Sequence, residues 1–181
     1  MKPKTEVPAR TRELIERMSQ LVPEFGSYQS TDSRRDDDGR FRVELCERLD
    51  IATVQLEDIL LEMSEEGWVP GMESIDQVIR DLDSMRERVT SGHDQPPEVS
   101  LAMDGDVTVQ RLLERDLALL VEMDSLQEHL TEVSKIPVSG RRLQQMLGEL
   151  TTAVFGIEEA ILARESLALP LCFGEPPRLA A

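Results

Sequence analysis

The chain has 181 residues, a length that suits one compact helical domain able to bury a core without disulfides or metals. Its formal net charge of −16 excludes ready binding to phosphate backbones or anionic membranes, because both depend on Lys and Arg. No apolar run approaches the roughly 18 residues of a membrane-spanning helix. Two distant cysteines, Cys46 and Cys172, and a charged start without an apolar leader favour a cytoplasmic protein with reduced thiols.

The N-terminal segment, residues 1–22, differs from the rest of the chain in charge. It holds five basic and three acidic side chains, which leaves a net charge of −18 for the remainder. The spacing of its apolar side chains predicts an amphipathic helix over 8–22. Residues 23–39 are rich in Gly, Ser and Asp and lack hydrophobic periodicity, so they predict a flexible linker. We therefore expect a small basic helix tethered to an acidic body.

Residues 40–168 predict the body of the fold. Apolar side chains recur there at spacings of three and four residues in four segments, which we expect to be helices: 40–66, 72–91, 106–135 and 140–168. Gly67 is a plausible C-terminal stop, and the short connection after it predicts that the next helix folds back antiparallel. The predicted fold is all-α: an antiparallel (up-down) four-helix bundle with an additional tethered N-terminal amphipathic helix. Residues 169–181 are expected to form an extended C-terminal tail.

Three local features predict details of the packing. The run from Leu117 to Val121 has no polar face, which predicts a central helix surrounded by protein. Gly148 and Gly156 lower helix stability, so we expect a neighbouring helix to approach closely there. Trp68, the only tryptophan, stands at the tip of the predicted hairpin. It would cap the bundle end there or anchor a partner.

No pattern of residues indicates catalysis, a cofactor or a metal. A di-iron bundle requires Glu-x-x-His, but Leu126 stands three residues before His129, and His93 lies in a predicted loop. With Gly39 at the sixth position of a calcium loop, the first and twelfth positions would be Arg34 and Leu45, which cannot be oxygen ligands. The glycines also lack phosphate-loop spacing.

The sequence therefore favours a non-enzymatic protein-protein interaction module, an adaptor or assembly subunit of a cytoplasmic complex. Its partner would be a basic or helical protein or a second copy of the chain, with no direct binding to nucleic acid or membrane. The candidate partner-binding residues are apolar side chains of the first helix, the hairpin tryptophan and three acids spaced four apart: Leu14, Ile15, Met18, Leu21, Trp68, Asp124, Glu128 and Glu132. Two alternatives remain open: an acidic inhibitor that mimics nucleic acid, and a helical-bundle enzyme or small-molecule binder with a core pocket.

Overall fold

The computed structural model describes residues 8–26, 28, 31–91, 105–137 and 140–168. The regular elements in this part of the chain are five helices, without any strand, so the all-α expectation is confirmed. They are α1 (Ala9–Leu21), α2 (Thr31–Glu65), α3 (Met72–Ser91), α4 (Gly105–Val133) and α5 (Arg141–Ala168). None of these described helices is long and apolar enough to cross a membrane. The predicted tail, Cys172 and His93 lie outside the described residues.

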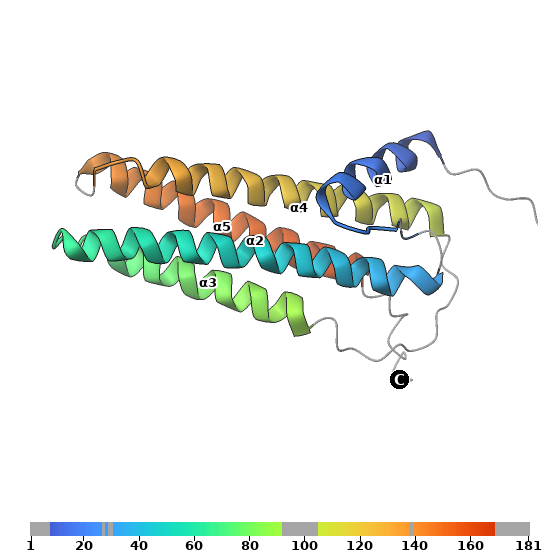
Figure 1. Cartoon of the computed structure of the whole chain (residues 1–181), viewed down its shortest axis with the longest axis horizontal. Coiled ribbons are helices and arrows are strands. Elements are labelled where there is room, and N and C mark those ends of the chain that lie inside the picture. Colours follow the sequence, from blue (N-terminus) through green and yellow to red (C-terminus); the bar gives the residue numbers. More distant parts are fainter. Residues whose placement is uncertain (1–7, 27, 29–30, 92–104, 138–139, 169–181) are drawn as a thin grey trace, which may run out of the picture.

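The four long helices, α2 to α5, lie lengthwise beside one another (Figure 1). α2 packs against α3 and α4, and α5 packs against the same two helices. The apolar stripes predicted from the sequence form the contacts: the α2 stripe from Leu45 to Met63 is buried, and so is the α5 stripe from Leu143 to Ile161. Removal of these side chains from water is the main force that holds the helices together.

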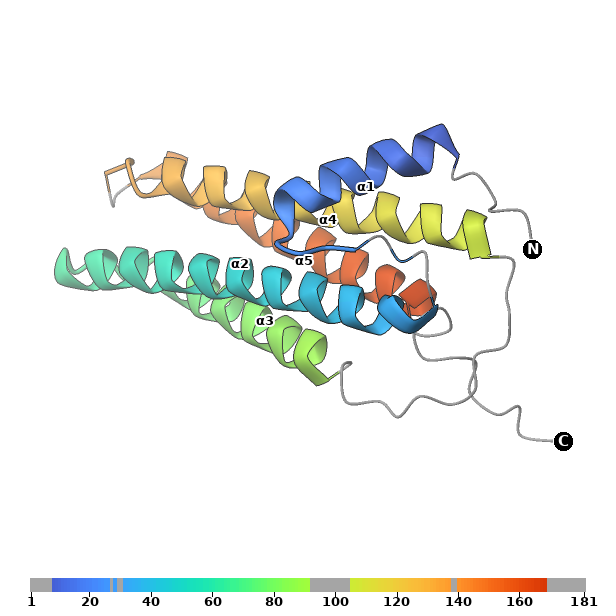
Figure 2. The same ribbon diagram turned by 45° about the vertical axis from the view of Figure 1, so that its right-hand side comes forward.

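The first helix, α1, packs along α4, as both views of the ribbon show (Figures 1 and 2). The sequence prediction of a helix here is confirmed. Leu14 and Met18 on its inner face are buried in the same core as the long helices. At its exposed edge the Arg10 guanidinium lies 3.8 Å from the Glu114 carboxylate of α4. The helix that was expected to be tethered is therefore docked on the body of its own chain.

Residues 23–39 were predicted to be a flexible linker. This prediction is wrong for residues 31–39, which form the first turns of α2, because that helix begins at Thr31. The physical reason lies in the inward face of this first stretch of α2. Asp37, Asp38 and Arg42 are buried there, at positions where the rest of the helix carries apolar side chains. A buried face made of charged residues has no hydrophobic period, so the pattern that reveals the rest of α2 is missing here.

The connection between α2 and α3 is a tight hairpin set by glycine. Gly67 has a φ of +69°, and the Trp68 N–H donates to the Met63 carbonyl at 2.9 Å, which closes the end of α2 and confirms the predicted stop. Gly71 has a φ of +97°, and a Cβ atom there would lie 2.8 Å from Leu147 Cδ1. The connection before α3 thus packs directly against Leu147 of α5.

The expected central position of α4 fits its contacts with three helices, α1, α2 and α5, but two details of the expected packing are wrong. In the run Leu117 to Val121, Ala118 is exposed and the Val121 side chain is 48% exposed. The reason is that α1 is only 13 residues long and cannot cover all of α4. A Cβ atom added to Gly148 or Gly156 would have nothing within 4 Å, so no described helix approaches closely there.

Candidate functional site

A network of buried charges lies where the N-terminal part of α2 meets α4 and α5. Its centre is Arg164 of α5, which is 2% exposed. The Arg164 Nε donates to Asp116 Oδ1 of α4 at 2.8 Å, and its Nη2 lies 2.6 Å from Asp38 Oδ1 of α2. The guanidinium carbon also stands 4.4 Å from the centre of the Phe41 ring. One cation thus joins three helices.

Tyr28 connects this network to the segment that precedes α2. The Tyr28 hydroxyl donates to Asp116 Oδ2 at 2.7 Å and accepts from Arg164 Nη2 at 3.2 Å. Its backbone N–H donates to Asp37 Oδ2 at 2.9 Å, and the Gly26 N–H donates to Asp37 Oδ1 at 2.7 Å. These bonds hold the chain after α1 against α2, so α1 is anchored at its C-terminal side.

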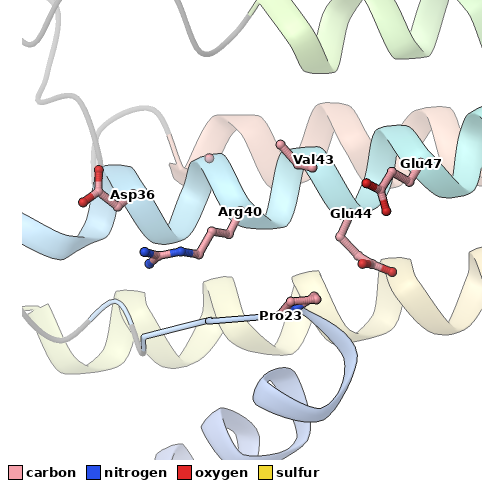
Figure 3. Close-up of a pocket in the computed structure, with 7 residues that line it drawn as sticks. Pro23, Asp36, Arg40, Val43, Glu44 and Glu47 are labelled. Atoms are coloured by element: carbon pink, nitrogen blue, oxygen red, sulfur yellow. The ribbon is translucent and has the colours of Figure 1, made fainter.

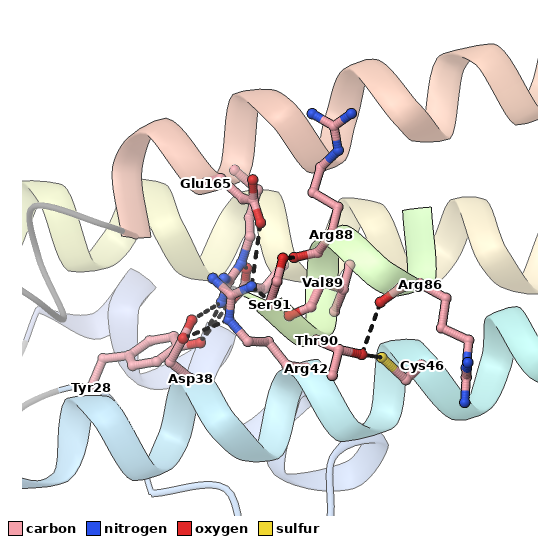
Figure 4. Close-up of polar contacts among 12 residues, drawn as sticks. Tyr28, Asp38, Arg42, Cys46, Arg86, Arg88, Val89, Thr90, Ser91 and Glu165 are labelled. Atoms are coloured by element: carbon pink, nitrogen blue, oxygen red, sulfur yellow. Dashed lines mark hydrogen bonds and ion pairs between the residues drawn. The ribbon is translucent and has the colours of Figure 1, made fainter. Parts of the chain in front are cut away.

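Arg42 extends the same network toward α3 (Figure 4). Its Nε donates to Asp38 Oδ2 at 2.7 Å, and its Nη1 donates to the Val89 carbonyl at 2.9 Å and to Glu165 Oε1 at 3.3 Å. The Val89 carbonyl belongs to the last turn of α3, where helix carbonyls lack intrahelical donors. Arg42 therefore stabilises the C-terminal end of α3 as well as a buried carboxylate.

The environment shifts the pKa values of the two acids in opposite directions. Burial acts to raise the pKa of Asp38, but the guanidinium groups of Arg164 and Arg42 outweigh it and hold the pKa below its usual value. Burial raises the pKa of Asp116, and the single cation Arg164 only partly offsets that effect. Burial and the nearby Asp116 carboxylate also raise the pKa of Tyr28.

This network is structural in its chemistry. Asp38 and Asp116 balance the charges of Arg42 and Arg164, and both acids and Tyr28 have no exposed surface. Asp38, Asp116 and Tyr28 therefore have no access to a substrate in this conformation, whereas Arg42 also borders a surface groove between α2 and the end of α3, and its Nη2 has no hydrogen-bond partner among the described residues. Sequence reasoning missed the network, although one signal was present. Asp116 and Arg164 are charges of opposite sign that interrupt the apolar stripes of neighbouring helices, a pattern that favours a buried ion pair.

The network places charged side chains inside the fold. On the outer side of α2 the reverse occurs, because apolar side chains are exposed there. Four aliphatic side chains there are about half exposed or more: Val43 (60%), Ile51 (49%), Val54 (54%) and Leu61 (59%). At 100° per residue, Val43, Val54 and Leu61 fall on one line opposite the buried stripe, with Ile51 to one side. We call these four residues the outer stripe of α2. It is about 27 Å long at about 1.5 Å per residue.

Carboxylates lie beside the outer stripe and also within it, because at 100° per residue Glu47 and Asp50 fall on the same line between Val43 and Val54. Six of them are exposed: Glu47, Asp50, Glu57, Asp58, Glu62 and Glu65. Asp50 is paired with Arg86 of α3 at 2.6 Å, between side chains that are each about half exposed. The outer stripe therefore consists of separate exposed aliphatic side chains with carboxylates between and beside them, whereas on α3 every large apolar side chain is buried or half-buried.

Val43, at the N-terminal end of the outer stripe, separates two surface grooves. The first, of about 500 Å³, lies between α2 and the segment after α1, and its lining is drawn in Figure 3: Pro23, Asp36, Gly39, Arg40, Val43, Glu44 and Glu47. The second, of about 410 Å³, lies between α2 and the end of α3 and is lined by Gly39, Arg42, Val43, Cys46, Glu47, Asp50, Val89 and Thr90. Gly39, Val43 and Glu47 border both grooves, so this end of the stripe has room for side chains on either side.

The apolar anchors predicted on the first helix are turned inward. Leu14 and Met18 are buried, and Ile15 and Leu21 are partly buried against the same core. In this conformation all four contact their own chain. A partner could reach them only if α1 left α4.

Of the other predicted partner-binding residues, Trp68 lies on the connection between α2 and α3, and the three acids lie on successive turns of α4. Trp68 is half-buried and packs against the core at the hairpin tip. Asp124 of α4 forms an ion pair with Arg48 of α2, and Glu132 is paired with Lys135 at 2.8 Å. Glu128 is exposed between them.

The remaining candidates for chemistry are isolated. His129 Nε2 lies 3.2 Å from the Met146 carbonyl, and the Cys46 sulfur lies 3.7 Å from the Thr90 hydroxyl. No group of three potential metal ligands occurs among the described residues. In comparisons with known proteins the chain matches no family model, no curated protein and no solved structure. Its function is therefore argued from its own residues.

Proposed function

We propose that this protein is a non-enzymatic adaptor or assembly subunit whose α2 binds an amphipathic helix of another protein. The observation that carries this proposal is the outer stripe of α2, four half-exposed aliphatic side chains on the outer side of one helix, three of them in line, with carboxylates between and beside them. An amphipathic helix lying along such a stripe would bury its own apolar face there. Lysines or arginines at its edges would meet the carboxylates of α2.

The proposed mode of binding needs both apolar and charged contacts. Fully burying one aliphatic side chain contributes about 1.5–3 kcal/mol, and these four are already about half buried. Complete burial of these four side chains by a partner would contribute roughly 4 kcal/mol. That free energy alone corresponds to a Kd of only about 1 mM. The carboxylates between and beside them must therefore supply attraction and orientation, and we expect binding to weaken as salt is added.

We also propose that α2 to α5 form an up-down antiparallel four-helix bundle, with α1 as an additional helix. Each long helix packs against two others of the four, and the connections α2–α3 and α4–α5 are short. In Figure 1 the colours run along α2 and back along α3. Such a bundle would hold α2 straight and keep the outer stripe turned away from the core.

A synthetic helix tests the proposed function. The probe is a fluorescent peptide of about 18 residues with leucines on one face and lysines beside them, and its Kd is measured by anisotropy. The first control is a scrambled peptide of equal charge without an apolar face. The protein variant is Val54→Glu with Leu61→Glu, and its matched control is Ser84→Glu on the exposed side of α3.

The design separates docking from general charge attraction. The double variant adds negative charge, so non-specific attraction of a lysine-rich peptide would become stronger, whereas docking on the outer stripe would become at least tenfold weaker. We expect the second result, with unchanged binding by Ser84→Glu and weak binding of the scrambled peptide. Equal or tighter binding by the double variant would show that the outer stripe is not a docking site.

A further inference from the structure

The outer face of α5 is a second exposed surface, and its chemistry differs from that of α2. Phe155 is 60% exposed, and Leu162, seven residues later on the same side of the helix, is 43% exposed. Phe155 is the most exposed aromatic side chain among the described residues. α5 packs against α3 and α4, on the side opposite Phe155. The proposal below does not depend on the function proposed for α2.

Glycines next to this aromatic side chain have no role inside the chain. Gly148 lies two turns before Phe155 on the same face, and Gly156 lies beside it. A Cβ atom at either glycine would meet nothing within 4 Å. Glycine lowers the stability of a helix, and here no neighbouring described element requires it. Together the glycines leave space next to an exposed ring.

The charges on this face are few and are arranged in a self-complementary way. Its middle part, from Gln144 to Phe155, consists of glutamine, glycine, threonine and phenylalanine side chains, although the chain as a whole is strongly acidic. Arg141 stands at one end of the face and Glu159 near the other, both exposed. If a second α5 is laid antiparallel across it, with the two-fold axis near residue 150, each Arg141 meets the Glu159 of the other copy. A parallel arrangement would place like charges together.

We propose that this α5 face is a two-fold interface with a second copy of the chain. In that arrangement the ring of each Phe155 lies level with Gln145 of the other copy, and Gly148, about one turn away, leaves space beside the ring. A two-fold interface uses the same patch on both molecules, so its residues must be complementary to themselves. The carboxylates along the α2 stripe fail this requirement because they would face like charges, whereas the α5 face satisfies it.

Sedimentation equilibrium of the full chain tests the interface, with a charge swap as the decisive comparison. We expect the wild-type protein to dimerise, Phe155→Glu to weaken the dimer at least tenfold, and Val121→Glu, a matched change at an exposed position on α4, to leave it unchanged. Arg141→Glu alone and Glu159→Arg alone each create a like-charge contact and weaken the dimer. The double variant Arg141→Glu with Glu159→Arg restores opposite charges and hence the dimer.

Two results would overturn the interface. One is a wild-type chain that stays monomeric at its highest soluble concentration. The other is dimerisation that is indifferent to Phe155→Glu or is not restored by the double charge swap. Circular dichroism verifies that each variant is folded. Binding of the leucine and lysine peptide by Phe155→Glu is measured in parallel and is expected to remain normal, so that failure of the α5 interface is distinguished from failure of the α2 site.

Discussion

The buried charge network and the outer stripe of α2 both reverse the usual distribution of side chains, one by placing charges inside and the other by placing aliphatic groups outside. The two reversals differ in how they are satisfied. Asp38, Asp116, Arg42 and Arg164 find partners of opposite charge within the chain. The side chains of the outer stripe remain half exposed, with no described part of the chain covering them. The first feature therefore serves the fold, and the second points to a partner.

This comparison predicts a separation of effects. Changes in the network should lower stability and leave partner binding intact in molecules that are still folded. Changes in the outer stripe should lower binding and leave stability intact. A variant that lowers both by similar amounts would break the distinction between the two regions.

The largest effect is expected for Arg164→Met. Removal of this cation leaves Asp38 and Asp116 buried without their shared partner, and breaking a buried pair in this way costs about 3–5 kcal/mol. Urea unfolding followed by the fluorescence of Trp68, the only tryptophan, measures the loss. Arg111→Met, at an exposed position of α4, is the control and should change stability by less than about 0.5 kcal/mol. A similar small loss in both variants would contradict a stabilising role for the network.

The next effect is expected for Gly26→Ala. A Cβ atom at position 26 would lie 2.6 Å from Asp37 Oδ1, so Asp37 must move and its bonds to the Gly26 and Tyr28 N–H groups are lost. We expect the free energy of unfolding to fall by about 2 kcal/mol. Gly156→Ala is the control, because open space and a helical backbone there predict a gain of up to about 1 kcal/mol. Losses of equal size at both glycines would argue against a fixed loop around Asp37.

Within the outer stripe, Val43→Asp should weaken binding of the leucine and lysine peptide more than Ile51→Asp. Val43 borders both grooves, whereas Ile51 lies to one side of the line. We expect at least a tenfold higher Kd for Val43→Asp, about 1.4 kcal/mol, with stability unchanged within about 0.5 kcal/mol. Anisotropy titration and urea unfolding give the two values. A stronger effect of Ile51→Asp would place the partner elsewhere on α2.

The smallest effect is a change in pH dependence. The pKa of Asp38 is lowered in the folded protein, so its contribution is present above the unfolded value of about 3.9 and is lost as pH falls below it. Asp38→Asn should therefore make the fall in stability below about pH 4 less steep, by up to about 1.4 kcal/mol per pH unit. Glu57→Gln, an exposed change on α2, is the control.

Asp116 supplies a test of the opposite sign. Its pKa is raised in the folded protein, so the folded state binds a proton more readily, and the stability from this group increases as pH falls. Removal of that gain by Asp116→Asn should make the loss of stability in acid steeper. Identical slopes for Asp38→Asn and Asp116→Asn would contradict the opposite shifts.

Much of the helical framework follows from hydrophobic spacing alone. The stripes of α2 and α5 were predictable because apolar residues recur every three or four positions, and the end of α2 was predictable from Gly67. The start of α2 was not, because its buried face carries the charged residues Asp37, Asp38 and Arg42, and Arg42 also bonds to Val89, which is distant in sequence. Only the folded chain brings Tyr28, Asp116 and Arg164 together.

The candidate site was predicted only in its chemistry. Composition indicated a strongly acidic body, and the prediction of a partner with basic side chains followed from it. The exposure of Val43, Val54 and Leu61 could not be predicted, because a second apolar line on a helix looks the same in sequence whether it is covered or bare. The apolar stripe of α1, whose residues stay a prediction as partner anchors, is covered by α4 in this structure.

The central claim, that the outer stripe of α2 receives a basic amphipathic helix, is tested most directly by methyl NMR spectroscopy. The full chain with labelled Ile, Leu and Val methyl groups is titrated with the leucine and lysine peptide. The account predicts that the largest shift changes fall on Val43, Ile51, Val54 and Leu61, and that Leu14 and Ile15 of α1 and Leu162 of α5 are unaffected. The largest changes on α1 or α5, with the four residues of the outer stripe unmoved, would contradict it.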